Sequence, residues 1–256
     1  MKNISLLGIR INPKDRRSVL EQIKKYLSHP RDSFQVISLN PENLVVAYEN
    51  KDFKRVVETS QTQIVDGIGV ELAGKMLGLD LERFTGVDLM EGLIKLAGKL
   101  RLRVLLVGGR ANLALRLAEC YSQSYAQASF KGIEGITNIK NPLQEEEKEI
   151  FSIVTGFKPH ILLVAFGSPD QELWLDRHKD QFAGIVTMGV GGAFDYLSGK
   201  ITRAPTFFRS VGLEWLFRLI REPWRSRRQV RLVKFVYLVL VQKLKSFLPN
   251  VDLQVY

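Results

Sequence analysis

The sequence predicts an α/β protein with a Rossmann-like parallel sheet, helices on both faces of that sheet, and a basic amphipathic helical appendage at the C-terminus. Short apolar runs alternate along the chain with segments of helical periodicity, a pattern typical of strands buried on both faces of a parallel sheet. Small or polar residues follow each apolar run, and basic residues are concentrated near the C-terminus. These observations together define the expected fold class.

The formal net charge of +10 is unevenly distributed. Residues 200–256 contain 12 Lys and Arg residues and 3 acidic residues, whereas residues 1–199 contain 25 basic and 24 acidic residues. We therefore predict a nearly neutral α/β body over residues 1–199 and a basic appendage over residues 200–256. Such a charge asymmetry indicates an anionic partner for the appendage.

Cysteine usage and hydropathy restrict the class of protein further. The single cysteine, Cys120, excludes an internal disulfide and a thiolate metal cage, and its place in an amphipathic helical pattern predicts a packed core thiol. The apolar patch at residues 4–9 is too short for a signal peptide. No stretch reaches the roughly 18 apolar residues of a spanning helix, so we expect a cytoplasmic protein.

The first two predicted strands end in polar residues. Residues 33–39 form an apolar strand pattern that carries Ser38 and leads into Asn40, and residues 63–65 lead directly into Asp66. A helical pattern follows each of them. The carboxyl ends of parallel strands are where open α/β sheets bind ligands, so we expect Asp66 to face a ligand. An Asp in this place can also cap the next helix or close a turn, and the pattern alone leaves that alternative open.

Three further strand patterns end in glycine. They are residues 104–107 before Gly108 and Gly109, residues 161–164 before Gly167, and residues 185–188 before the glycines of 189–192. Glycine lets a ligand approach the backbone, and the helix that follows offers N–H donors to an anion. We predict a phosphate-containing ligand at this edge, although tight strand-to-helix turns need glycine in any case.

Known nucleotide and metal motifs are mostly missing. The sequence has no phosphate-binding P-loop, and Phe194 stands where a dinucleotide fingerprint requires its third glycine. It also has no Asp-x-Asp, and its three histidines lack paired metal-ligand spacing. We therefore predict no metal and no cofactor. The charge of a leaving diphosphate would have to be met by arginines, lysines or helix dipoles.

The segment 81–88 is unusually polar for a link between two helical patterns. Its Arg83 could pair with a phosphate or with the nearby Asp88. The sequence does not choose between them.

The appendage contains two apolar and basic helical patterns, which Pro223 separates. The second pattern places one apolar stripe on a single helix face, formed by Val233, Val236, Tyr237, Leu240, Leu244 and Phe247. A basic amphipathic helix with aromatic residues is typical of elements that bind an anionic membrane surface. A terminal helix docked on the body, or a module that binds nucleic acid, are alternatives. The apolar density of the appendage favours the membrane over nucleic acid.

A series of short motifs, in collinear order over nearly the whole chain, resembles the WecG/TagA/CpsF family of bacterial glycosyltransferases, family 26. The motifs that carry the resemblance are Asn40-Pro41-Glu42, Asp66-Gly67-Ile68-Gly69-Val70, Arg83-Phe84-Thr85-Gly86-Val87-Asp88-Leu89-Met90, Leu106-Val107-Gly108-Gly109, Gly167-Ser168-Pro169-Asp170-Gln171-Glu172, Gly189-Val190-Gly191-Gly192-Ala193-Phe194-Asp195, Arg203-Ala204-Pro205, Gly212-Leu213-Glu214-Trp215-Leu216-Phe217-Arg218-Leu219 and Glu222-Pro223-Trp224-Arg225.

The resemblance implies transfer of a sugar from a UDP-sugar to an undecaprenyl-diphosphate-linked sugar at the inner face of the membrane. The usual pair is UDP-N-acetylmannosamine and lipid-linked N-acetylglucosamine, in teichoic acid linkage units or related surface polysaccharides. An inverting, metal-independent enzyme with a membrane-binding appendage is expected. Transfer of glucose or another hexose to a different polyprenyl carrier is the alternative. The expected partners are these two substrates and an anionic membrane surface, without nucleic acid, and a homo-oligomer is left open.

Carried over residue by residue, the resemblance implies that Asp66 is the catalytic base and that Ser38 and Asn40 line the pocket beside it. The residues implied to bind substrate are Arg83, Gly108, Gly109, Gln171 and Asp195, with Arg218, Arg221 and Arg225 for the diphosphate. Ser38 departs from the threonine of the family pattern. The segment 132–136 lacks the aromatic residue that often follows its glycine, which leaves the identity of the sugar or base open.

Overall fold

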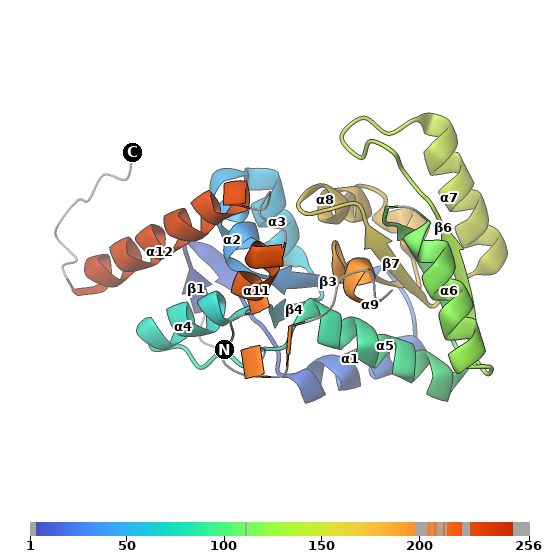
Figure 1. Cartoon of the computed structure of the whole chain (residues 1–256), viewed down its shortest axis with the longest axis horizontal. Helices are drawn as coiled ribbons and strands as arrows, with labels where there is room; N and C mark the ends of the chain where they lie inside the picture. The colour runs from blue at the N-terminus through green and yellow to red at the C-terminus, as the bar shows by residue number, and fades with distance from the viewer. Residues whose placement is uncertain are drawn as a thin grey trace.

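The fold is a six-stranded parallel sheet between two layers of helices (Figure 1). The computed structural model describes residues 4–110, 112–197, 204–205, 207–208, 212, 214–221 and 226–247. The strand order is β4-β3-β8-β7-β5-β6. The strands are β3 (Phe34–Leu39), β4 (Thr62–Val65), β5 (Arg103–Gly108), β6 (Ser129–Ile133), β7 (Ile161–Ala165) and β8 (Val186–Gly189). This arrangement confirms the predicted fold class.

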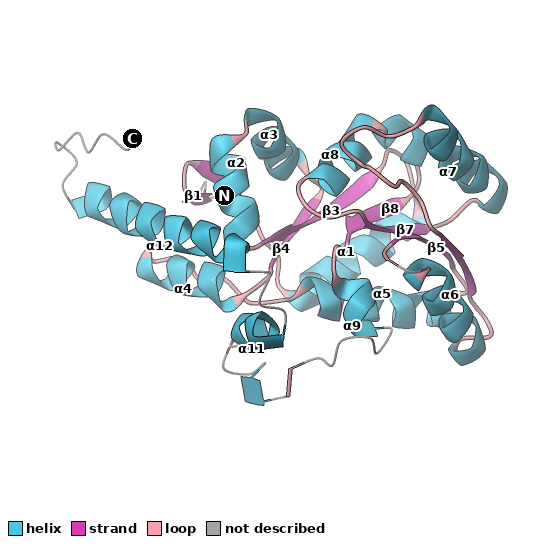
Figure 2. Cartoon of the chain, turned by 45° about the horizontal axis from the view of Figure 1, so that its top comes forward, coloured by secondary structure: helices cyan, strands magenta, loops and turns pink. Residues whose placement is uncertain are grey.

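Two sets of helices cover the two faces of the sheet (Figure 2). One face carries α1 (Arg16–Ser28), α5 (Gly86–Leu100), α6 (Leu113–Ser124) and α9 (Ala193–Leu197). The other carries α2 (Pro41–Glu49), α3 (Lys51–Thr59), α7 (Gln144–Phe157) and α8 (Asp170–Arg177), with the short 3-10 helix η1 (Lys179–Phe182) after α8. The helix α4 (Ile68–Met76) follows β4.

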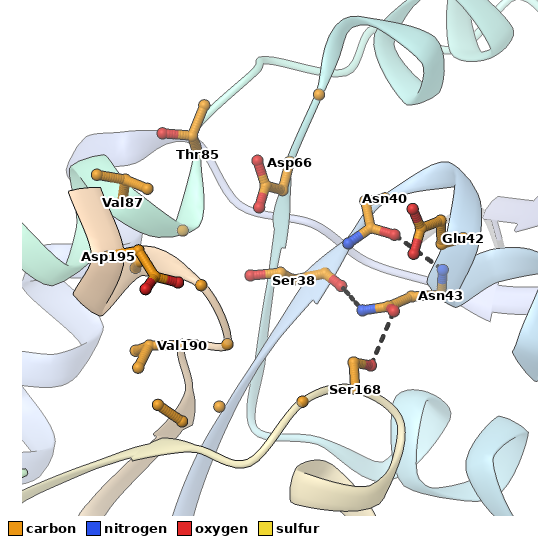
Figure 3. A pocket seen from close by; sticks show the side chains of 18 of the residues that line it. Ser38, Asn40, Glu42, Asn43, Asp66, Thr85, Val87, Ser168, Val190 and Asp195 are labelled. Carbon is orange, nitrogen blue, oxygen red and sulfur yellow. Dashed lines mark hydrogen bonds between the residues drawn. The ribbon is translucent and has the colours of Figure 1, made fainter. Parts of the chain in front are cut away.

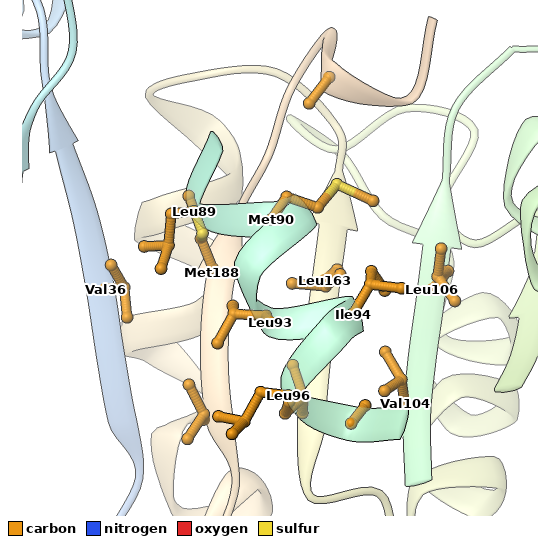
Figure 4. Close-up of a cluster of buried hydrophobic side chains, with 14 of the residues drawn as sticks. Val36, Leu89, Met90, Leu93, Ile94, Leu96, Val104, Leu106, Leu163 and Met188 are labelled. Atoms are coloured by element: carbon orange, nitrogen blue, oxygen red, sulfur yellow. The ribbon is translucent and has the colours of Figure 1, made fainter. Parts of the chain in front are cut away.

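The core consists of apolar clusters on the two faces of the strands. On one face, Leu93 and Ile94 of α5 lie over β5 and its neighbours (Figure 4). Along β5 itself, Leu106 belongs to this cluster, whereas Leu105 and Val107 belong to the cluster under α7 and α8. Because both sets of side chains are buried, the strand needs apolar residues at consecutive positions.

The loops that follow the four central strands lead to alternate faces of the sheet. The chain goes from β5 to α6 and from β8 to α9 on one face, and from β3 to α2 and from β7 to α8 on the other. In the order β3-β8-β7-β5, the loops that follow neighbouring strands therefore lead to opposite faces of the sheet and leave a crevice between them. Ligands of open α/β sheets bind in crevices of this kind.

Some elements differ from the sequence prediction. The hairpin of β1 (Ile4–Leu6) and β2 (Ile9–Ile11) was not predicted, nor was the edge strand β6. The residues of β6 are exposed or half-buried, so the strand lacks the continuous apolar run that marks the central strands. The prediction for Cys120 is wrong. This residue is exposed, because the buried stripe of α6 runs through Leu113, Ala114, Leu117 and Ala118.

The appendage contains α11 (Glu214–Arg221) and α12 (Ser226–Phe247). Helix α12 lies along α2 (Figures 1 and 2), and its Phe235, Leu238 and Val239 are buried in the same cluster as the apolar residues of α2. Lys234 of α12 also pairs with Glu49 of α2 at 2.5 Å. The expected boundary between body and appendage near residue 199 lies outside the described residues.

The predicted apolar stripe of α12 faces away from the body. Its members Val233, Val236, Tyr237, Leu240 and Leu244 are exposed, and the side chain of Phe247 lies outside the described residues. Helix α12 therefore has one apolar face against the body and a second apolar face in solvent. Within the described part of the chain, the helices are too short or too polar to cross a membrane.

Two glycines provide a matched test of the packing between β6 and α6. A Cβ atom on Gly132 would lie 2.2 Å from the carbonyl oxygen of Ala114, which is backbone and cannot move aside, whereas a Cβ atom on Gly156 of α7 would meet nothing within 4 Å. We expect Gly132→Ala to lower the free energy of unfolding by about 1–3 kcal/mol. Gly156→Ala should raise it by up to about 1 kcal/mol through helix propensity. Urea unfolding measures both, and equal effects of the two variants would contradict the close approach.

Candidate functional site

A cavity of about 1750 Å³ opens at the carboxyl edge of the sheet. It is lined by the residues that follow β3, β4, β5, β7 and β8, by the N-terminal turn of α5, and by side chains of α11 and α12. Pockets for one drug-sized ligand have volumes of about 300–1,000 Å³. The cavity therefore has room for a second, adjacent ligand.

Asp66 enters this cavity at the end of β4. Strand β4 pairs with β3 in parallel, with Val65 opposite Leu39, and the backbone N–H of Asp66 donates to the Leu39 carbonyl at 2.8 Å. The Asp66 side chain is half-buried and points into the cavity near Ser38 (Figure 3). The sheet thus fixes the backbone that presents this carboxylate.

The N-terminus of α5 lies against Asp66 and Ser38. A Cβ atom on Gly86, the first residue of α5, would lie 3.2 Å from Ser38 Oγ and 3.3 Å from Asp66 Oδ2. Thr85 caps the helix, since its Oγ1 accepts from the Asp88 N–H at 3.2 Å and donates to Asp88 Oδ2 at 2.7 Å. The positive end of a helix dipole therefore faces a carboxylate and a hydroxyl, an arrangement that stabilises negative charge.

Asn40 occupies the N-cap of α2. Its Oδ1 accepts from the Asn43 N–H at 2.8 Å, and its amide nitrogen points toward the cavity in Figure 3. The side-chain oxygen of Asn40 therefore caps α2. Its nitrogen remains directed at the cavity.

Asn43 is a buried member of the site that the sequence analysis missed. Its Nδ2 donates to the Ser38 carbonyl at 3.0 Å, and its Oδ1 accepts from Ser168 Oγ at 2.8 Å. These two bonds join the end of β3 to the loop after β7. An asparagine within an otherwise apolar helical stretch was the signal that could have identified it.

Gln171 and Glu172 of α8 lie beneath the loops after β7 and β8. Gln171 Oε1 accepts from the N–H groups of Gly167 at 3.0 Å and Gly191 at 3.2 Å. A Cβ atom on Gly189 would lie 2.5 Å from Gln171 Nε2, so the close packing here requires glycine. The amide oxygen of Gln171 is thus used to hold two loops, while the residue still lines the cavity.

The remaining predicted site residues also line the cavity where they are described. Gly108 and Gly109 have φ angles of 91° and 83°, a backbone region that favours glycine. Arg83, Asp195 and Arg221 are in the lining as well, and Arg221 lies over the Phe217 ring at 5.4 Å. Arg225 and the side chain of Arg218 lie outside the described residues.

The backbone of the appendage approaches the body at Gly212. A Cβ atom there would lie 2.5 Å from Ile68 Cβ and 3.0 Å from Arg83 Nη1. The φ angle of Gly212 is 77°, so both the conformation and the space favour glycine. This contact brings the segment before α11 to the same arginine that lines the cavity.

The lining is mixed in charge. Its described residues include seven acidic side chains and three arginines, one of which, Arg110, was not predicted. Among the described residues, an anionic group therefore finds complementary charge near Arg83, Arg110 and Arg221 or at a helix N-terminus. Within the described residues, no group of three or more His, Cys, Asp and Glu side chains is arranged to hold a metal ion.

The chain is similar to known proteins over most of its length. The model of the glycosyl transferase WecG/TagA/CpsF family matches residues 4–248. An N-acetylglucosaminyldiphosphoundecaprenol N-acetyl-beta-D-mannosaminyltransferase of Bacillus spizizenii is 31% identical over 231 residues, which cover 90% of this chain and 87% of the relative. A protein of the same name from Bacillus subtilis is 26% identical over 236 residues, 91% of this chain and 90% of the relative.

The family match extends from β1 to the end of α12. The chain therefore belongs to the WecG/TagA/CpsF family of glycosyltransferases.

Proposed function

We propose that the protein transfers N-acetylmannosamine from UDP-N-acetylmannosamine to undecaprenyl-diphosphate-linked N-acetylglucosamine, with inversion and without a metal ion. The observation that carries this proposal is the Asp66 carboxylate, which the sheet holds inside the cavity beside Ser38 and the N-terminus of α5. The names of the two relatives support the choice of transferred sugar and acceptor.

A single carboxylate is sufficient for this reaction. Asp66 takes the proton of the acceptor hydroxyl while the hydroxyl oxygen forms a bond to the anomeric carbon of the donor sugar. The bond from that carbon to the UDP oxygen breaks, and UDP leaves with the electron pair. Attack from the face opposite the leaving group inverts the configuration.

The charge that develops on UDP requires a positive environment. Arg83, Arg110 and Arg221 line the cavity in the described residues, and we propose that they take this role together with Arg218 and Arg225. The absence of Asp-x-Asp from the sequence supports arginines in place of a metal ion. Asn40, Gln171, Asp195 and the backbone at Gly108 and Gly109 are the proposed contacts to the donor.

We also propose that the protein lies on the inner, cytoplasmic face of an anionic membrane through its appendage. The described members of the apolar stripe of α12 are exposed. Four further apolar side chains are exposed as well, namely Leu72 and Met76 of α4 and Trp215 and Ile220 of α11. Among these residues, Leu72, Trp215 and Val236 also line the cavity. The apolar surface is therefore continuous with the cavity, as a lipid-linked acceptor requires.

The reaction is tested by UDP release from a panel of UDP-sugars, with a polyprenyl-diphosphate-N-acetylglucosamine analogue and excess chelator. We expect release that depends on the acceptor and is fastest with UDP-N-acetylmannosamine. Faster release from UDP-glucose would identify a different transferred sugar. Release that chelator abolishes would contradict metal independence.

Asp66→Asn should lower kcat by about 100-fold or more, because the amide cannot take the proton of the acceptor. The control is Asp52→Asn, an exposed carboxylate in the first turn of α3 that does not line the cavity. Wild-type kcat in Asp66→Asn would remove this residue from the mechanism.

The membrane proposal is tested with paired leucine substitutions. The first double variant, Leu240→Asp with Leu244→Asp, changes two leucines of the apolar stripe of α12 that are 46% and 50% exposed. The control double variant, Leu100→Asp with Leu143→Asp, changes two leucines outside the appendage that are 48% and 62% exposed. We expect the first pair to weaken sedimentation with anionic vesicles by about tenfold or more, from lost apolar burial and charge repulsion. Equal weakening by both pairs would contradict a role for this stripe.

A further inference from the structure

A fully enclosed carboxyl group, that of Glu172, lies beneath the cavity between the loops that follow β7 and β8. Glu172 is 2% exposed. Its Oε1 accepts from Gln171 Nε2 at 2.7 Å, whereas its Oε2 is buried and has no hydrogen-bond partner of ordinary geometry among the described residues. The Ser168 side chain is near enough to interact with the carboxyl group.

An ionised carboxylate is poorly suited to this position. It can only accept hydrogen bonds, and burying it without a positive partner carries a large desolvation cost. The ionised neighbour that acts on it is Asp170, which has the same sign. Burial therefore raises the pKa of Glu172, and the hydrogen bond from Gln171 opposes this effect.

The neighbouring hydrogen bonds fix what Ser168 can offer to Glu172. Asn43 Nδ2 donates to the Ser38 carbonyl at 3.0 Å, which leaves Asn43 Oδ1 as an acceptor. Ser168 Oγ donates its single proton to that Oδ1 at 2.8 Å. Toward Glu172, the Ser168 oxygen can then only accept, and a protonated Oε2–H is the donor that it needs.

We propose that Glu172 is a positioning residue, a neutral carboxylic acid that accepts from Gln171, donates to Ser168, and so fixes both sides of the cavity floor. On one side, Gln171 holds the N–H groups of Gly167 and Gly191. On the other, Ser168 and Asn43 reach the backbone of Ser38. The role in turnover rests on the proposed transferase function, whereas the protonation state of Glu172 does not.

Two substitutions distinguish this role from general packing. In Glu172→Gln the side-chain amide keeps one acceptor and one donor in nearly the same shape, as a neutral acid does, whereas Glu172→Leu removes both. We expect kcat/KM of Glu172→Gln to stay within about threefold of wild type, because its hydrogen bonds are preserved. Glu172→Leu should lose about 100-fold through misplacement of the reacting groups.

An infrared measurement tests the protonation state without any substrate. The difference spectrum of wild type minus Glu172→Gln at pH 7 should contain the carbonyl stretch of a protonated carboxylic acid, shifted in D₂O. The control difference, wild type minus Glu145→Gln at an exposed position on α7, should lack it.

The outcomes separate this proposal from the proposed function. A carboxylate band in place of the acid band, or a folded Glu172→Gln as impaired as Glu172→Leu, would overturn the role of Glu172. If Glu172→Leu does not fold, Glu172→Gln and the infrared band decide. If wild type releases no UDP from any donor, the transferase proposal fails while the infrared band still decides whether Glu172 is neutral.

Discussion

The buried side-chain amide of Asn43 joins two parts of the protein on which the site depends. It connects the end of β3 to the loop after β7 through the Ser38 carbonyl and the Ser168 hydroxyl, although β8 lies between these two strands in the sheet. Neighbouring central strands send their loops to opposite faces, so backbone hydrogen bonding ends where the cavity begins. Buried polar side chains then replace the sheet as the connection, and each must be satisfied because an unpaired polar group is costly there.

Close approach is the second constraint on this region. Three glycines lie where a Cβ atom would approach a side chain of the site too closely. A Cβ atom on Gly86 would approach Ser38 and Asp66, one on Gly189 would approach Gln171, and one on Gly212 would approach Arg83. Glycine at these positions is a consequence of packing density around functional side chains. The tight turns that also need glycine, such as those at Gly108 and Gly109, are a separate matter of backbone conformation.

The sequence was sufficient to predict the central strands and the residues at their ends, because both signals are local. Continuous apolar runs predicted β3, β7 and β8, and the polar or glycine residues after them line one cavity. It was not sufficient for β6, whose exposed or half-buried residues form no continuous apolar run, or for Asn43 and Glu172. The contacts of those two residues come from partners that are distant in the sequence and close in the fold. One example is Gln35, 137 positions from Glu172, whose side-chain amide donates to the backbone carbonyl of Glu172. The exposure of Cys120 depended on the exact orientation of α6, which a helical pattern defines only approximately.

The N-terminal hairpin and the C-terminal helix are linked by one side chain, Gln242. Its Oε1 accepts from the Leu7 N–H at 2.7 Å and its Nε2 donates to the Ser5 carbonyl at 3.0 Å, while Phe235, Leu238 and Val239 complete the cluster that contains Leu6 and Ile9. Synthesis from the N-terminus therefore makes the hairpin long before its partner helix. Until the ribosome has released α12, the apolar surface of α2 and the hairpin lacks its cover, and it is open to chaperones or to aggregation. A chain that stops early in translation would keep that surface exposed permanently.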